Sequence, residues 1–199
     1  MISLIARVTS FIFNPYFLLV PVPYLLVLRQ TGSTEEAVEW SLFSLAFLLL
    51  LGIVVYCLVQ KRYFSDLDIS KKEQRPYFFL LMSLFAIGYF CGLFYFRGPV
   101  VLFISLSGVF FSLLVFSFLI TRIKASIHVA TITAMIFSLS VLYGGQFLLL
   151  LFLIPLIGWS RIHARRHTHQ EVIAGGIIGI IIPVVMFVVF KVLLNISLS

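Results

Sequence analysis

Long apolar runs are the feature that most limits what this chain can fold into. A helix needs about 20 apolar residues to cross the hydrocarbon core of a bilayer. The chain contains seven mostly apolar segments, at about 9–28, 39–59, 77–96, 99–121, 128–143, 146–159 and 172–194. The sequence therefore predicts an all-α, polytopic bundle of six to seven transmembrane helices, integral to the cell or inner membrane.

Composition excludes most other classes of protein. Of the 199 residues, 62% are hydrophobic and only 11% are charged, which excludes a water-soluble enzyme and a disordered tail. The spans leave no room for a sizeable extramembrane domain, so we expect a single integral membrane domain over residues 1–199. Any chemistry must then lie in loops or at helix ends. Cys57 and Cys91 lie inside apolar runs and are interpreted as small core hydrophobes.

The first apolar segment, at about 9–28, is the least regular. It carries Asn14, Pro15, Pro21 and Pro23, and proline interrupts a helix because it lacks a backbone N–H and clashes with the preceding turn. We therefore expect this segment to be kinked or partly re-entrant. No convincing small-residue cleavage site follows it, so it is interpreted as retained rather than as a signal peptide.

The basic residues are divided unevenly between the two predicted sides of the membrane. If all seven segments cross, the N-terminus and the loops at 60–76, 122–127 and 160–171 share one side. Eleven of the fourteen basic residues lie there: Arg7, Lys61, Arg62, Lys71, Lys72, Arg75, Arg122, Lys124, Arg161, Arg165 and Arg166. The other side has Arg29, Arg97 and Lys191. Even without the four that a site could use (Lys71, Lys72, Arg75 and Arg161), the positive-inside rule places this basic side in the cytoplasm.

All four histidines also lie on the basic side, at the ends of apolar segments. Interfacial loops are where polar residues are tolerated, so each one alone has an ordinary explanation. Titratable groups at membrane depth are nevertheless costly unless they serve a ligand or one another. Helix packing would bring residues from three of these loops together at membrane depth. We therefore predict a site formed by Arg75, His128, Arg161, His167 and Glu171.

The loop from Ser160 to Glu171 carries the most specific pattern. His167 and Glu171 are four residues apart, so on a helix the carboxylate can accept the imidazole N–H and make the other ring nitrogen a better nucleophile. Thr168 and Glu171 also fit a capping box, which explains the same glutamate without chemistry. Both interpretations place His167 at a helix N-terminus, which favours an anion such as phosphate. The neighbouring arginines agree, because arginine makes bidentate contacts with phosphate oxygens.

This spacing resembles the third signature of the type-2 phosphatidic acid phosphatase family, which is related to the vanadium haloperoxidases. The signature is Ser-Arg, five residues, His, three residues and an acid. It is matched by Ser160, Arg161, His167 and Glu171, with Glu where Asp is usual. The resemblance implies that the fold has a haloperoxidase-like helical core, with its motifs on about 61–194.

The other two signatures of the family are matched less closely. The second, usually Pro-Ser-Gly-His, is matched loosely by Ala125-Ser126-Ile127-His128. The first, usually Lys, six residues and Arg-Pro, is matched by Arg75-Pro76, but Asp68 occupies the lysine position. The nearby candidates to replace that lysine are Lys71 and Lys72.

The resemblance implies a metal-independent lipid phosphatase without a cofactor. It would hydrolyse a lipid phosphate or diphosphate monoester, such as phosphatidic acid, phosphatidylglycerophosphate or a polyprenyl (di)phosphate. His167 would form a phosphohistidine, Glu171 would orient it, and His128 would protonate the leaving alkoxide. The phosphate would be held by Arg75, Arg161, Lys71, Lys72 and Ser126. The expected partners are the lipid phosphate substrate and membrane lipids; nucleic acid is not expected.

Two alternatives remain open at this point. Asp68 and Ile127 depart from the family pattern, which is compatible with a non-catalytic protein that binds or transports lipid phosphates. A phosphotransferase that uses an acceptor other than water is the other alternative. His163 and His169 have no counterpart in the family and are interpreted as interfacial polar residues. Gly175 and Gly179 form a small-xxx-small pair, which favours a role in helix packing.

Overall fold

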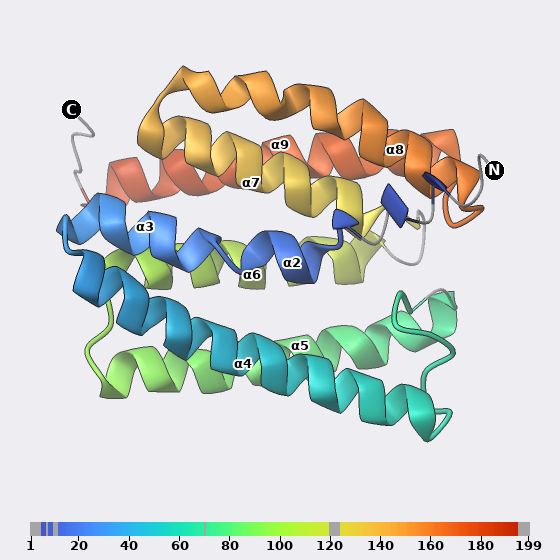
Figure 1. Ribbon diagram of the computed structural model, residues 1–199, viewed down its shortest axis with the longest axis horizontal. Coiled ribbons are helices and arrows are strands. Elements are labelled where there is room, and N and C mark those ends of the chain that lie inside the picture. Colours follow the sequence, from blue (N-terminus) through green and yellow to red (C-terminus); the bar gives the residue numbers. More distant parts are fainter. Residues whose placement is uncertain (1–4, 7, 10–11, 70, 120–123, 195–199) are drawn as a thin grey trace. The chain divides into compact units, whose positions relative to one another are not determined.

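The computed structural model describes residues 5–6, 8–9, 12–69, 71–119 and 124–194, and Figure 1 shows its helices. These residues form helices and loops, without a strand among them, which confirms the all-α prediction. The elements are α2 (Pro15–Leu19), α3 (Val22–Thr31), α4 (Thr34–Gln60), the 3₁₀ helix η1 (Lys72–Gln74), α5 (Arg75–Tyr95), α6 (Val100–Leu119), α7 (Ile127–Tyr143), the 3₁₀ helix η2 (Gly145–Phe152), α8 (Leu153–His163) and α9 (His169–Leu194).

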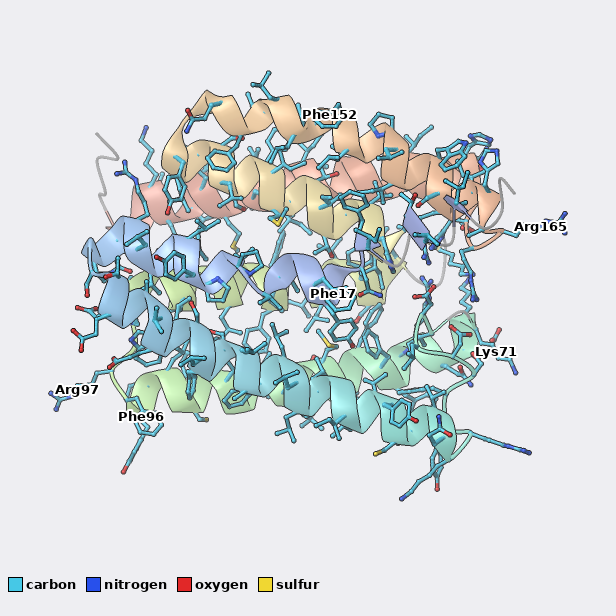
Figure 2. All side chains as sticks on the ribbon, in the orientation of Figure 1. Phe17, Lys71, Phe96, Arg97, Phe152 and Arg165 are labelled. Atoms are coloured by element: carbon cyan, nitrogen blue, oxygen red, sulfur yellow. The ribbon has the colours of Figure 1, made fainter. Side chains whose placement is uncertain are left out.

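Five helical stretches are long and apolar enough to cross a membrane, which indicates an integral membrane protein. They are Thr34–Gln60, Lys72–Tyr95, Val100–Leu119, Gly145–His163 and His169–Val192. Their outer surfaces carry large apolar side chains: Phe152, for example, is 66% exposed. Phe96, directly after α5, is 61% exposed and points outward (Figure 2). Such faces are suited to contact with lipid chains rather than water.

The two remaining predicted segments form shorter helices. The segment at about 9–28 is interrupted, because α2 ends at Leu19 and α3 begins at Val22 after the N-cap residue Pro21. Proline is favoured at the start of a helix and disfavoured in its interior, so the predicted irregularity is confirmed here as a break between two helices. Pro183, in contrast, lies inside α9. The segment at 128–143 forms α7, an apolar helix of 17 residues.

The chain divides into two compact units. The central unit is Leu19–Arg122, and the terminal unit combines Met1–Leu18 with Ile123–Ser199. In the central unit α3 packs on α4 and α6, and α5 packs on α4 and α6. In the terminal unit α7, α8 and α9 pack on one another, and η2 packs on α7 and α8. The expectation of a single membrane domain stays a prediction.

Helix ends in the central unit are fixed by side chains as well as by the backbone. The hydroxyl of Ser33 caps α4 by accepting a hydrogen bond from the Glu36 N–H at 3.2 Å. The Gln30 side chain, from α3, accepts a hydrogen bond from the Val101 N–H in the first turn of α6 at 2.8 Å. The two helices are thereby joined at this end of the unit.

The packing of α4 on α5 depends on glycine and on one polar pair. A Cβ added at Gly92 would lie 2.5 Å from Cζ of Phe43, so glycine makes room for the Phe43 ring against α5. Ser44 and Tyr89 share a hydrogen bond of 2.7 Å between their hydroxyls, a contact of the kind that joins helices within a bilayer.

Cys57 and Cys91 are exposed, so the prediction that they belong to the core is wrong. Hydropathy does not separate a face that contacts lipid from one that contacts a helix.

The terminal unit has its core between α7, α8 and α9, which run alongside one another in Figure 1. Its central cluster of fully buried hydrophobic residues is formed by Val129, Ile132, Ile136 and Ile157. Gly175 and Gly179 of α9 lie against the backbone of α7, so their predicted packing role is confirmed. The start of α7 also lies beside the start of α9, because the Ser126 N–H donates to the Glu171 carbonyl at 3.0 Å.

The short apolar segment predicted at 146–159 gains length from an unusual helix type. Residues Gly145–Phe152 form a 3₁₀ helix before α8 begins, and a 3₁₀ helix rises about 2.0 Å per residue rather than 1.5 Å. The combined stretch Gly145–His163 therefore extends about 32 Å, close to the thickness of a hydrocarbon core. It returns the chain to the end at which α7 began.

Candidate functional site

His167 and Glu171 form the predicted side-chain pair. The His167 Nδ1 atom lies 2.8 Å from Oε2 of Glu171. The His167 side chain is only 4% exposed and that of Glu171 is 20% exposed. With Nδ1 as the donor to the carboxylate, Nε2 is the nitrogen that keeps its lone pair. This is the arrangement that nucleophilic attack by a histidine requires.

Glu171 also closes the predicted capping box. Its Oε2 atom accepts a hydrogen bond from the Thr168 N–H at 3.2 Å, and its own N–H donates to Thr168 Oγ1 at 3.3 Å. The helix α9 begins at His169, the residue after Thr168. The two interpretations of the sequence are therefore both present in the structure, because a single carboxylate oxygen caps the helix and binds the imidazole.

The loop before α9 turns back onto the end of α8. The Arg161 carbonyl accepts hydrogen bonds from the Arg166 N–H at 3.0 Å and the His167 N–H at 3.3 Å. Arg165 has a φ of 56°, in the left-handed region that favours glycine. Its side chain is exposed and points away from the unit in Figure 2. The turn thus fixes the backbone of His167 and leaves Arg165 outside the site.

Ser126 lies at the N-cap of α7 and has a buried hydroxyl. The residue is 0% exposed, and its Oγ atom makes no hydrogen bond within the described part of the chain. An N-cap serine normally accepts a hydrogen bond from its own helix, but this hydroxyl does not. A buried hydroxyl without a partner is costly, so this atom has an unused capacity for hydrogen bonding. His128, two residues further on, is 8% exposed.

Ser160 and Arg161 lie at the end of α8, with 0% and 3% exposure. The Ser160 hydroxyl donates to the Ile157 carbonyl at 2.8 Å and so belongs to its own helix. Arg161 is thus buried at the end of a helix rather than exposed on a loop. Arginine is rarely buried to this extent unless it is paired, and it is well suited to bind carboxylates and phosphates.

The residues of the first motif belong to the central unit. Arg75 begins α5, is 4% exposed, and donates from Nε to the Ile69 carbonyl at 3.4 Å. Lys71 and Lys72 are exposed, and the Asp68 N–H donates to a side-chain oxygen of Asp66 at 3.0 Å.

Of the predicted site residues, the structure brings together Ser126, His167 and Glu171. The convergence of these residues with Arg75, Lys71 and Lys72 stays a prediction.

The loop that carries Lys71 and Lys72 is ordered by Gln74, which the sequence did not single out. Its side chain accepts a hydrogen bond from the Ser65 N–H at 3.0 Å and donates to the Tyr63 carbonyl at 3.2 Å. No local pattern could have predicted these contacts, because they join residues on opposite arms of the loop.

The basic residues of the central unit follow the predicted division between its two ends. Figure 2 shows Lys71 at one end of this unit and Arg97 at the other. Arg7 and Arg122, which were counted on the basic side, lie outside the described residues.

The other two histidines lie outside this set of contacts. His163 packs against Trp159, with ring centroids 4.8 Å apart, and its Nδ1 atom lies 3.0 Å from the Trp159 carbonyl. His169 is exposed at the first position of α9. Among the described residues, no three His, Cys, Asp or Glu side chains are grouped in a way that suits a metal ion.

No model of a known protein family, no curated protein and no solved structure matches this chain.

Proposed function

We propose that this protein is an integral membrane phosphatase that hydrolyses a phosphate or diphosphate monoester of a lipid. Phosphatidic acid, phosphatidylglycerophosphate and polyprenyl (di)phosphates are the substrates to which the motif resemblance points. The observation that carries the proposal is the 2.8 Å contact between Nδ1 of His167 and Oε2 of Glu171, with the imidazole almost fully buried. A buried histidine oriented by a carboxylate is an activated nucleophile.

The first step of the proposed reaction is transfer of the phosphoryl group to His167. Nε2 attacks phosphorus, an N–P bond forms, and the bond from phosphorus to the lipid oxygen breaks. His128 gives a proton to the departing alkoxide as a general acid. Arg161 and the Ser126 hydroxyl bind the nonbridging oxygens, and Arg75 with Lys71 or Lys72 completes this group if the two units converge. Positive groups fixed around phosphorus stabilise charge in the transition state.

The second step releases inorganic phosphate. His128, now neutral, takes a proton from water as the water attacks phosphorus, and the N–P bond breaks. His167 returns to its starting state with Nδ1 still bound to Glu171. No acceptor other than water and no bound metal takes part in this scheme.

We further propose that all seven apolar segments cross and that the phosphate site faces the cytoplasm. Support for the crossing of α7 comes from its ends. Ser126 lies beside Glu171, and the stretch Gly145–His163 returns the chain to the same end, so α7 runs in the opposite direction, over about 26 Å. Support for the cytoplasmic side comes from the excess of basic residues in the loops that carry the motifs.

The direct test is phosphate release by the purified protein from a panel of lipid phosphates in detergent. We expect release in the presence of EDTA, inhibition by orthovanadate, and loss of release in His167→Ala. Arg165→Ala is the matched control, because this exposed arginine lies in the same loop. Turnover that requires an added divalent metal would contradict the proposed mechanism.

The same assay separates the two alternatives. If no lipid is turned over while phosphate analogues bind in a manner that depends on His167 and Arg161, the protein binds lipid phosphates without hydrolysing them. If the phosphoryl group leaves the lipid but appears on a second alcohol rather than in inorganic phosphate, the protein is a phosphotransferase.

A further inference from the structure

Gly175 makes a backbone contact that no larger residue could make. A Cβ atom added at this position would lie 2.5 Å from the Ser126 carbonyl oxygen and 3.3 Å from the Ser126 N and C atoms. Real Cβ atoms do not approach an oxygen to 2.5 Å, and here the neighbour is backbone rather than a flexible side chain. Any residue other than glycine at 175 must therefore push the start of α7 away from α9.

The Ser126 backbone at this contact is held by two further hydrogen bonds. Its N–H donates to the Glu171 carbonyl at 3.0 Å, and its carbonyl accepts from the Ala130 N–H at 3.0 Å. Ser126 is the N-cap residue of α7, so a displacement of Ser126 displaces the first turn of that helix. His128 lies in this turn.

Glu171 links this contact to the nucleophile. Its carboxylate binds Nδ1 of His167 at 2.8 Å, and its main-chain carbonyl binds the Ser126 N–H. Gly175 lies one helical turn after Glu171 on the same side of α9. The position of the Ser126 turn relative to the His167–Glu171 pair therefore depends on a close contact at 175.

From these contacts we infer that Gly175 is a positioning residue, which sets the placement of Ser126 and His128 relative to His167 and Glu171. The inference rests on the proposed function, because it assigns this placement a consequence for phosphate chemistry. A second observation supports it: the buried Ser126 hydroxyl makes no hydrogen bond within the described residues. No side-chain hydrogen bond within these residues fixes the hydroxyl, so its placement depends on the backbone that Gly175 contacts.

Two neighbouring glycines provide matched controls. A Cβ at Gly179 would lie 2.5 Å from the Ala130 carbonyl and 2.6 Å from Cβ of Thr133, so Gly179→Ala disturbs the same pair of helices one turn further from the site. A Cβ at Gly176 would approach only Cγ1 of Val129, at 3.9 Å, an ordinary contact. Gly175→Ala and Gly179→Ala thus separate α7 from α9 at different points, whereas Gly176→Ala does not separate them.

The experiment compares Gly175→Ala, Gly176→Ala and Gly179→Ala in the full-length protein in detergent. The thermal midpoint, the hydrogen exchange rate of the Ser126 amide, and kcat and KM for phosphate release are measured for each. We expect both Gly175→Ala and Gly179→Ala to lower the midpoint. Only Gly175→Ala should speed exchange of the Ser126 amide, by tenfold or more, and lower kcat by about 10²-fold with a smaller change in KM. Gly176→Ala should resemble the wild type.

Two results would overturn the inference: an equal loss of kcat per folded molecule in Gly175→Ala and Gly179→Ala, or a Ser126 amide that exchanges in Gly175→Ala as slowly as in the wild type. Failure of the proposed function is a separate outcome, seen when the wild-type protein releases no phosphate. Amide exchange then decides the role of Gly175 alone, since it needs no turnover. Faster exchange restricted to Gly175→Ala supports the positioning role, and its absence contradicts it.

Discussion

At the scale of single residues, Glu171 makes two contacts, one that caps α9 and one with His167, and different substitutions can separate their effects. Its Oε2 atom caps α9 through the Thr168 N–H and also binds Nδ1 of His167. Capping requires only an acceptor of the right reach, which glutamine also provides. Activation of the histidine requires a negative charge, which glutamine lacks. Stability and chemistry at this residue therefore depend on different properties of the same side chain.

We predict that Glu171→Gln keeps the thermal midpoint within a few degrees of the wild type but lowers phosphate release by 10²-fold or more. The amide oxygen still accepts from the Thr168 N–H, whereas a neutral group cannot stabilise the imidazolium that would develop in the proposed reaction. Thermal unfolding and initial rates in detergent measure the two effects. Glu171→Ala should lose the cap as well and be destabilised by about 1 kcal/mol. Full activity in Glu171→Gln would show that Glu171 is only a cap.

At the scale of elements, the start of α6 depends on a residue from another helix. The Gln30 side chain accepts the Val101 N–H at 2.8 Å. The first N–H groups of a helix have no partner within it, and a side-chain acceptor there contributes about 1 kcal/mol.

We predict that Gln30→Ala destabilises the protein by about 1 kcal/mol and speeds hydrogen exchange at the Val101 amide. Gln30→Glu should preserve stability, because a carboxylate accepts the same hydrogen bond and its charge is favourable at a helix N-terminus. Gln60→Ala, which changes an exposed glutamine at the end of α4, is the control. An unchanged Val101 exchange rate in Gln30→Ala would contradict the assigned cap.

At the scale of the whole molecule, the orientation of the membrane-spanning helices can be read from the two ends of α4. Glu35 lies at its start, and Lys61 follows its end. Both are exposed, so each can be replaced by cysteine without disturbing a core. Cys57 and Cys91 are exposed as well and must first be replaced.

We predict that, in intact cells, an impermeant thiol reagent modifies Glu35→Cys and leaves Lys61→Cys unlabelled. The motif-bearing loops would then face the cytoplasm, as the distribution of basic residues indicates. Labelling after permeabilisation should reach both positions and serves as the control. Ready labelling of Lys61→Cys in intact cells would reverse the orientation.

Substitution of Arg75 and Arg161, singly and together, tests whether the two units contribute to one site. If Arg75 and Arg161 bind the same phosphate, we expect each Arg→Gln variant to lower kcat/KM by 10²-fold or more, and the double variant to lose less than the product of the two. Groups that stabilise one transition state act together in this way. Arg62→Gln, on an exposed arginine of the Lys61–Gln74 loop, is the control. Full activity in Arg75→Gln, or independent losses, would place Arg75 outside the site.

Features that depend on composition and on short spacing could be predicted from the sequence. The length of the apolar runs fixed the class of protein, because only a helix satisfies its own backbone within a bilayer. The contact between His167 and Glu171 was expected from their spacing of four residues, but α9 begins only at His169, so the capping turn at Thr168 and not helical geometry alone brings the two side chains together. The break near Pro21 followed equally from the covalent structure of proline.

Contacts between residues far apart in the chain became known only from the folded structure. The Ser126 N–H binds the Glu171 carbonyl, and Gly175 admits the Ser126 backbone. The spacing of Gly175 and Gly179 indicated helix packing, but nothing in the sequence identified Ser126 as the residue that Gly175 contacts. Cys57 and Cys91 were placed wrongly for a related reason: lipid and protein interior are equally apolar, so hydropathy cannot say which face of a helix packs on another. Backbone contacts between helices depend on how closely the two helices approach one another. The spacing of residues along one helix carries no information about that distance.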